Sequence, residues 1–149
     1  MLSLDTNVIV YAFDARDAAK RATALHVLGA APTVGAQIGL QVVGETQNAL
    51  IRRLRMDKSK VVPIVRDLLV RFGTFGYVRS NVLSAIDDLA VGRLSYWDGL
   101  LVSSAAAAGC QTFLSEDMQD GAAFGRLKVV NPFAADGTLS AGAAAALAP

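Results

Sequence analysis

The sequence contains one cysteine and one histidine, and these two scarcities limit the chemistry open to it. Cys110 can form neither an internal disulfide bond nor a cysteine-based zinc site, and its alanine- and glycine-rich surroundings indicate a buried structural thiol. His26 lies in a helical pattern of alanine and leucine, which argues against a serine–histidine–aspartate triad. Any catalytic chemistry must therefore come from other side chains.

Long apolar runs are also missing from the chain. No stretch of about 20 uninterrupted apolar residues occurs, so we expect no transmembrane helix and no membrane partner. The first apolar run has an acid at residue 5 and no basic segment before it, which does not fit a secretory signal peptide. We therefore expect a cytoplasmic protein.

The net charge of the chain is also small, with a formal value of only +1 at pH 7. The whole chain is thus not marked as a nucleic-acid binder, and a polyanion would have to meet a local basic patch or a metal ion. The main basic cluster is a candidate to guide phosphate groups, although an ordinary charged helix end explains it equally well. Its members are Arg52, Arg53, Arg55, Lys58 and Lys60.

Apolar residues are plentiful, at 53% of the 149 residues. This length fits one domain with a substantial core. So high an apolar content is unusual for a soluble monomer, and it indicates that part of the surface is covered by a second copy or another partner.

Short strand-like runs alternate with longer helical patterns along the chain. We expect strands at residues 1–4, 33–35, 74–78, 111–115 and 127–130, and helices at residues 17–29, 40–55, 59–72, 81–94 and 95–108. The alternation indicates an α/β domain with a parallel sheet over residues 1–133. Residues 134–149 are mostly alanine and glycine, so we expect a poorly ordered tail or a weak terminal helix there.

Four acidic residues stand in different local settings. Asp5 and Asp117 each follow a strand-like run, so both fall at the carboxyl edge of a parallel sheet, unless each only caps the next helix or turn. Asp98 stands three residues after Ser95, as in a helix-capping pattern. Glu45 lies on a polar helix stripe, which a solvated face also explains.

If folding brings these carboxylates together, they repel one another and cannot all stay ionised without a cation. Oxygen ligands of this kind suit Mg²⁺ or Mn²⁺. Three acids near the end of the strand at residues 111–115 are candidates for the fourth acid of the set. The Ser115-x-Asp117 pattern favours Asp117, and Asp120 is the second candidate. Glu116 is expected to point away from the site. The hydroxyls of Thr6 and Ser115 stand beside acids and can orient a carboxylate, a water or a phosphate.

Four segments together resemble the PIN-domain ribonuclease family: Leu4-Asp5-Thr6-Asn7-Val8-Ile9-Val10-Tyr11, Glu45, Tyr96-Trp97-Asp98 and Leu114-Ser115-Glu116-Asp117. The chain length and the late Val130-Asn131-Pro132-Phe133 are similar to VapC-type toxins within that family. The resemblance covers about residues 1–133. It carries the family's site residues onto Asp5, Glu45, Asp98, Asp117, Ser115 and Asn7.

The resemblance implies a three-layer α/β/α fold with a central, mostly parallel sheet. It also implies a Mg²⁺- or Mn²⁺-dependent endoribonuclease that cleaves single-stranded or structured RNA, with Asp5, Asp98 and Asp117 holding the metal and Glu45 completing its shell. A homodimer and a cognate antitoxin protein are the partners implied. The alternatives are a catalytically silent module that binds RNA or protein, and a metal-dependent phosphatase, although the chain has no Asp-x-Asp after its first strand and no Walker A loop.

Overall fold

The computed structural model describes residues 1–148 and contains a six-stranded sheet with the order β3-β2-β1-β4-β6-β5. All neighbouring strands are parallel except β5 and β6, so the predicted mostly parallel sheet is confirmed. The strands are β1 (Leu2–Leu4), β2 (Gln37–Gly39), β3 (Gly73–Phe75), β4 (Thr112–Leu114), β5 (Ala123–Phe124) and β6 (Leu127–Val130).

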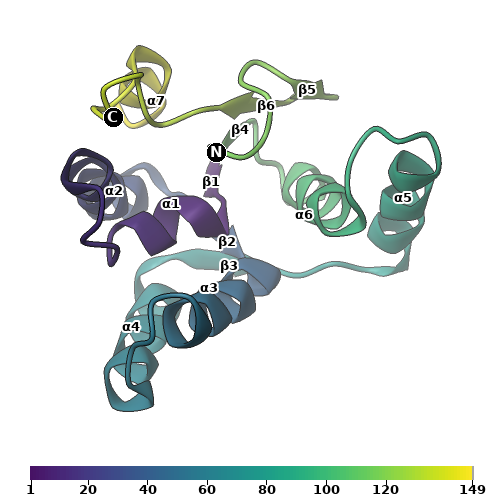
Figure 1. The fold of residues 1–149 in the computed structure, drawn as a ribbon. Helices are drawn as coiled ribbons and strands as arrows, with labels where there is room; N and C mark the ends of the chain where they lie inside the picture. Colours follow the sequence, from purple (N-terminus) through teal and green to yellow (C-terminus); the bar gives the residue numbers. More distant parts are fainter. Residues whose placement is uncertain (149) are drawn as a thin grey trace.

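Helices cover both faces of this sheet, as the predicted three-layer arrangement requires. Figure 1 shows α1, α2 and α7 on one side of the strands and α5 and α6 on the other. The helical elements are α1 (Thr6–Tyr11), α2 (Ala18–Ala30), the 3-10 turn η1 (Ala31–Val34), α3 (Leu40–Arg52), α4 (Lys58–Arg71), α5 (Arg79–Ala90), α6 (Tyr96–Ala107) and α7 (Ala141–Ala146). Within residues 1–148, none of these helices has the length and apolar character needed to cross a bilayer.

The central strands β1 and β4 are buried on both faces, as expected of parallel strands between helical layers. Leu4 and Leu114 are fully buried and stand opposite each other in the register. One residue further on, the backbone N–H of Asp5 donates to the carbonyl of Leu114 at 2.9 Å. The carboxyl ends of these two strands are therefore held side by side by the core.

The prediction of a strand at residues 33–35 was wrong. Pro32 has no N–H and a fixed φ suited to a first helical turn, so the chain forms η1 there, and Gly35 ends the turn with φ of 71°. The strand begins only at Gln37. The sequence reasoning also missed the short helix α1, whose apolar residues Val8, Ile9 and Val10 lack a helical period but are all buried.

From residue 134 onward, the structure has a short packed helix. Ser140 caps α7 by accepting the N–H of Ala143 at 3.2 Å. Ala143 and Leu147 are buried, and the hydroxyl of Thr23 in α2 donates to the carbonyl of Gly137 at 2.8 Å. Pro149, the last residue of the segment expected to be a tail, lies outside the described residues.

Candidate active site

The carboxyl edge of the sheet gathers acidic side chains from four elements. Asp5 caps α1 directly after β1, and Asp117 lies in the loop after β4. Glu45 comes from α3, which begins where β2 ends, and Asp98 lies in the first turn of α6. Since β1 pairs with both β2 and β4, the parallel topology places all four predicted acids at one edge.

Asp5 is held by three hydrogen-bond donors. Its Oδ1 accepts the backbone N–H of Thr6 at 2.7 Å. Its Oδ2 accepts the hydroxyl of Ser115 at 2.6 Å and the side-chain amide of Asn7 at 3.0 Å. Ser115 is completely buried, so this carboxylate has a fixed orientation at the end of β1.

Burial raises the pKa of Asp5 from 3.8 to about 6, although its hydrogen bonds from Ser115 and Thr6 act in the opposite direction. The negative charges of Asp117 and Asp98 are smaller contributions to the same rise in pKa. Two carboxylates from distant parts of the sequence therefore influence the ionisation of Asp5.

Glu45 is oriented by Thr6 and Gln41. Its Oε2 accepts the hydroxyl of Thr6 at 2.8 Å, which connects α3 to α1 beside Asp5. Its Oε1 accepts the amide of Gln41 one helical turn earlier, at 2.9 Å. The same amide donates to the backbone carbonyl of Trp97 at 3.2 Å, so Gln41 joins Glu45 to the start of α6 next to Asp98. The sequence showed Gln41 only as part of a polar stripe.

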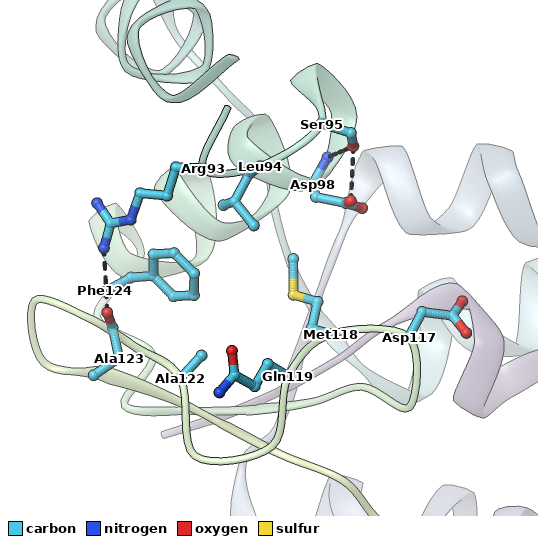
Figure 2. A pocket seen from close by; sticks show the side chains of 10 residues that line it. All are labelled: Arg93, Leu94, Ser95, Asp98, Asp117, Met118, Gln119, Ala122, Ala123 and Phe124. Carbon is cyan, nitrogen blue, oxygen red and sulfur yellow. Dashed lines mark hydrogen bonds between the residues drawn. The ribbon is translucent and has the colours of Figure 1, made fainter. Parts of the chain in front are cut away.

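Asp98 and Asp117 are the exposed acids of the site. Oδ2 of Asp98 accepts the hydroxyl of Ser95 at 2.7 Å, and Ser95 Oγ accepts the backbone N–H of Asp98 at 3.2 Å, which is the predicted capping interaction. Both acids line an open cavity of about 400 Å³, and Figure 2 shows their carboxylates at the same end of it.

The two competing acids of the loop after β4 have other partners. Glu116 forms an ion pair with Lys20 of α2, away from the site. Asp120 accepts the backbone N–H of Asn131 at 2.8 Å and so braces the loop against the end of β6. Among residues 1–148, Asp117 has no side-chain hydrogen bond, which leaves its carboxylate available to a ligand.

The donor set suits a hard divalent cation, because every candidate ligand is a carboxylate oxygen. In the part of the chain that the structure describes, however, no three acidic, histidine or cysteine side chains are grouped closely enough to hold an ion. The Asp98 carboxylate is turned toward Ser95. The side chains of Asp98 and Asp117 are exposed, so neither is fixed by packing.

The predicted basic cluster lies at the end of α3 and the start of α4, and its five cationic side chains are exposed. Arg52 is seven residues from Glu45 in the same helix, which corresponds to about 10 Å along the axis. Its role in guiding phosphates remains a prediction.

No protein-family model and no curated protein sequence matches this chain. Solved structures do match it. VapC20 of Mycobacterium tuberculosis, described as a sarcin-ricin loop cleaving toxin, has a TM-score of 0.65 and 18% identity over 78% of this chain and 90% of that one. A toxin–antitoxin complex from Klebsiella pneumoniae has a TM-score of 0.65 and 18% identity, covering 89% of this chain and 98% of that one.

VapBC2 from Rickettsia felis, solved with a DNA fragment from its promoter, matches with a TM-score of 0.61 and 16% identity over 86% of this chain and 96% of that one. At these identities the likeness shows the fold. The chain thus has the fold of VapC toxins of the PIN-domain type, and the fold implied by the sequence resemblance is confirmed.

Proposed function

We propose that this chain, which shares the fold of VapC toxins, is a Mg²⁺- or Mn²⁺-dependent endoribonuclease and the toxin of a toxin–antitoxin pair. The observation that carries the proposal is the half-buried, firmly held carboxylate of Asp5. Three donors fix its position, while Asp98 and Asp117 raise its pKa to about 6 together with burial. A structural cap would not need two further acids nearby, whereas a cation site does.

Asp5, Asp98 and Asp117 are the proposed metal ligands, and Glu45 completes the shell or holds a second ion. When bound, the ion activates water and stabilises charge on phosphate oxygens. Ser115 and Asn7 keep the Asp5 carboxylate in one orientation, and Thr6 and Gln41 do the same for Glu45. Such fixed carboxylates require little reorganisation on binding, which is the usual basis of a precise site.

RNA is the proposed substrate class. One structural match, VapC20, is described as cleaving the sarcin-ricin loop, and others are toxin–antitoxin complexes. These descriptions, together with the acidic site at the edge of the same fold, support phosphodiester hydrolysis in RNA and an antitoxin partner.

The test is cleavage of total RNA by the wild type and by the isosteric variants Asp5→Asn and Asp98→Asn, with Mg²⁺ and with excess EDTA. We expect each variant, and EDTA, to lower the cleavage rate by roughly a hundredfold or more, because the metal is lost or misplaced. Asp67→Asn is the matched control, since Asp67 is an exposed acid on α4 that pairs only with Arg71. Undiminished cleavage by both variants, or full activity in EDTA, would contradict the proposal.

A catalytically silent binding module is the second candidate, and one observation favours it. Within residues 1–148, the acids do not form a ready-made group of metal ligands. Calorimetric titration with Mn²⁺ separates the two candidates, because a silent module needs no metal. Heat of binding that disappears in Asp5→Asn supports the nuclease, and its absence in the wild type supports the silent module.

Two apolar surfaces fit the proposed protein partners. The exposed side chains of Leu83, Ile86 and Leu89 recur every three residues along α5, and we propose this face for a homodimer. A groove of about 410 Å³ separates α2 from α4, and we propose it for an apolar antitoxin helix. The groove is lined mainly by Phe13, Leu25, Leu28, Pro63, Ile64 and Leu68.

A further inference from the structure

We propose that the cavity beside Asp98 and Asp117 binds one unstacked nucleobase of the RNA, next to the phosphate that is cleaved. The inference rests on the proposed function, and it adds a second kind of site to it. The cavity shares both acids with the candidate active site, so whatever occupies it lies directly beside the reacting phosphate. Its volume of about 400 Å³ is in the range of ordinary ligand pockets.

Part of the cavity wall is apolar and includes the ring of Phe124. Leu94 from the approach to α6, Met118 from the loop after β4, and Phe124 from β5 face one another across it (Figure 2). Proteins that recognise single-stranded RNA commonly stack its bases on aromatic rings, and sulfur and aliphatic side chains can enclose the other face. This apolar part of the wall suits the flat face of a base.

Arg93 supports the Phe124 ring from behind. Its guanidinium lies 4.7 Å from the ring centroid and donates to the carbonyl of Ala123 at 3.4 Å and to Asp88 at 3.5 Å. Figure 2 shows the ring between this guanidinium and the middle of the cavity. Arg93 is thus engaged with protein groups and steadies the stacking surface, so it is a positioning residue and not the expected phosphate ligand.

Gln119 supplies the polar group that such a base would require. Its exposed amide points toward the cavity beside Met118 (Figure 2), and no hydrogen bond from it is found within the described part of the chain. The amide offers one acceptor and one donor group side by side, which can pair with the polar edge of a base. The loop is braced around it: the N–H of Met118 donates to Ser115 at 3.3 Å, and Asp120 binds Asn131.

Charge distinguishes a base from a phosphate as the occupant. Asp98 and Asp117 line one end of the cavity (Figure 2), and they repel a phosphate unless a cation lies between them. A neutral base suffers no such repulsion. The scissile phosphate and the base would therefore lie on the two sides of this acidic pair.

The test maps cleavage sites in total RNA for the wild type, Gln119→Ala and Phe124→Leu. We expect Gln119→Ala to relax the base preference at one position beside the cut. We expect Phe124→Leu to lower cleavage roughly tenfold through lost stacking. Gln111→Ala, directly before β4, and Phe72→Leu, directly before β3, are the matched controls, because both lie at the edge of the sheet opposite the site. Wild-type preference and rate in both test variants would overturn the inference.

A binding measurement tests the base site independently of whether the protein cleaves RNA. Short single-stranded RNAs containing the fluorescent base 2-aminopurine are titrated with each folded protein, as judged by thermal melting. If Phe124→Leu lowers the affinity measured by this quenching roughly tenfold, the base site is supported, even if the wild type cleaves no RNA. If neither Phe124→Leu nor Gln119→Ala changes the affinity, the base site is overturned, even if RNA cleavage is confirmed. Should Phe124→Leu fail to fold, the exposed Gln119→Ala decides alone.

Discussion

The Asp5 carboxylate is firmly oriented, but its ionised form is energetically unfavourable in the folded protein. Three hydrogen bonds hold its carboxylate, yet burial and two neighbouring acids raise its pKa to about 6. In the metal-free protein, its ionisation therefore opposes folding near neutral pH. The proposed cation would oppose this effect, so metal binding at Asp5 would also raise stability.

Asp5→Asn is predicted to stabilise the metal-free protein above about pH 6. The folded-state pKa lies above the unfolded value of 3.8, so the folded chain binds the proton more tightly, and its stability falls as the pH rises from about 4 through 6. Asparagine removes this loss but gives up one accepted hydrogen bond, so we expect a net gain of about 1 kcal/mol near neutral pH and a net loss near pH 4. Urea unfolding in EDTA measures it.

Asp67→Asn is the control for that measurement, because its carboxylate is exposed on α4. The prediction is contradicted if the difference between Asp5→Asn and the wild type is the same at both pH values.

The roles of Asp117 and Asp120 can be distinguished by replacing each with asparagine. Asp117 has a carboxylate available at the cavity, whereas Asp120 accepts the N–H of Asn131. We expect Asp117→Asn to reduce RNA cleavage by roughly a hundredfold and Asp120→Asn to leave it within a few-fold of the wild type, since asparagine can still accept that hydrogen bond. The measurement is the cleavage rate of each variant on one RNA. A larger loss in Asp120→Asn than in Asp117→Asn would identify Asp120 as the fourth acid of the site.

At the scale of elements, the packing of neighbouring helices fixes the start of α6 and therefore the position of Asp98. A Cβ on Gly99 would lie 3.2 Å from Cα of Ala85, so α5 approaches α6 closely just beyond Asp98. Gln41 ties α3 to the start of α6 through Trp97. The position of Asp98 thus depends on two neighbouring helices as well as on its own cap.

The terminal helix α7 is predicted to contribute to stability despite its simple composition. Leu147 is buried against the core, so Leu147→Ala should lower the free energy of unfolding by about 2 kcal/mol. Leu25→Ala removes the same atoms from a half-exposed position on α2 and should cost less than about 1 kcal/mol. Equal denaturation midpoints for the two variants would show that α7 does not pack on the domain in solution.

At the scale of the whole molecule, exposed apolar side chains are concentrated on helices. Leu83, Ile86 and Leu89 are each about half exposed on α5, in keeping with the high apolar content of the chain. Apolar surface gathered in this way on a small protein commonly marks a protein contact.

Ile86→Glu is predicted to convert a dimer to a monomer, because it places a charge in the centre of the proposed α5 interface. Val70→Glu, at a more exposed apolar position on α4, should leave the dimer intact. Light scattering after size exclusion measures the mass. A monomeric wild type, or a dimer that persists in Ile86→Glu, would exclude this face as the contact.

Sequence alone was sufficient for the α/β class, the mostly parallel sheet and the carboxyl-edge positions of Asp5 and Asp117. These follow from local patterns, because short buried runs that alternate with helical patterns indicate a parallel sheet, and each of the two acids directly follows such a run. The two failures, at residues 33–35 and at α1, occur where local signals are weak and the turn at Pro32 or the burial of Val8, Ile9 and Val10 decides the structure.

Only the tertiary structure decided which side chains meet. Contacts between residues far apart in sequence, such as Thr6 with Glu45, Ser115 with Asp5, and Gln41 with Trp97, depend on strand order and helix packing, which no local pattern encodes. The cavity that includes Phe124 and Gln119 is likewise a product of the fold. The sequence determined the chemical groups available to this protein, and packing determined their orientation, exposure and neighbours.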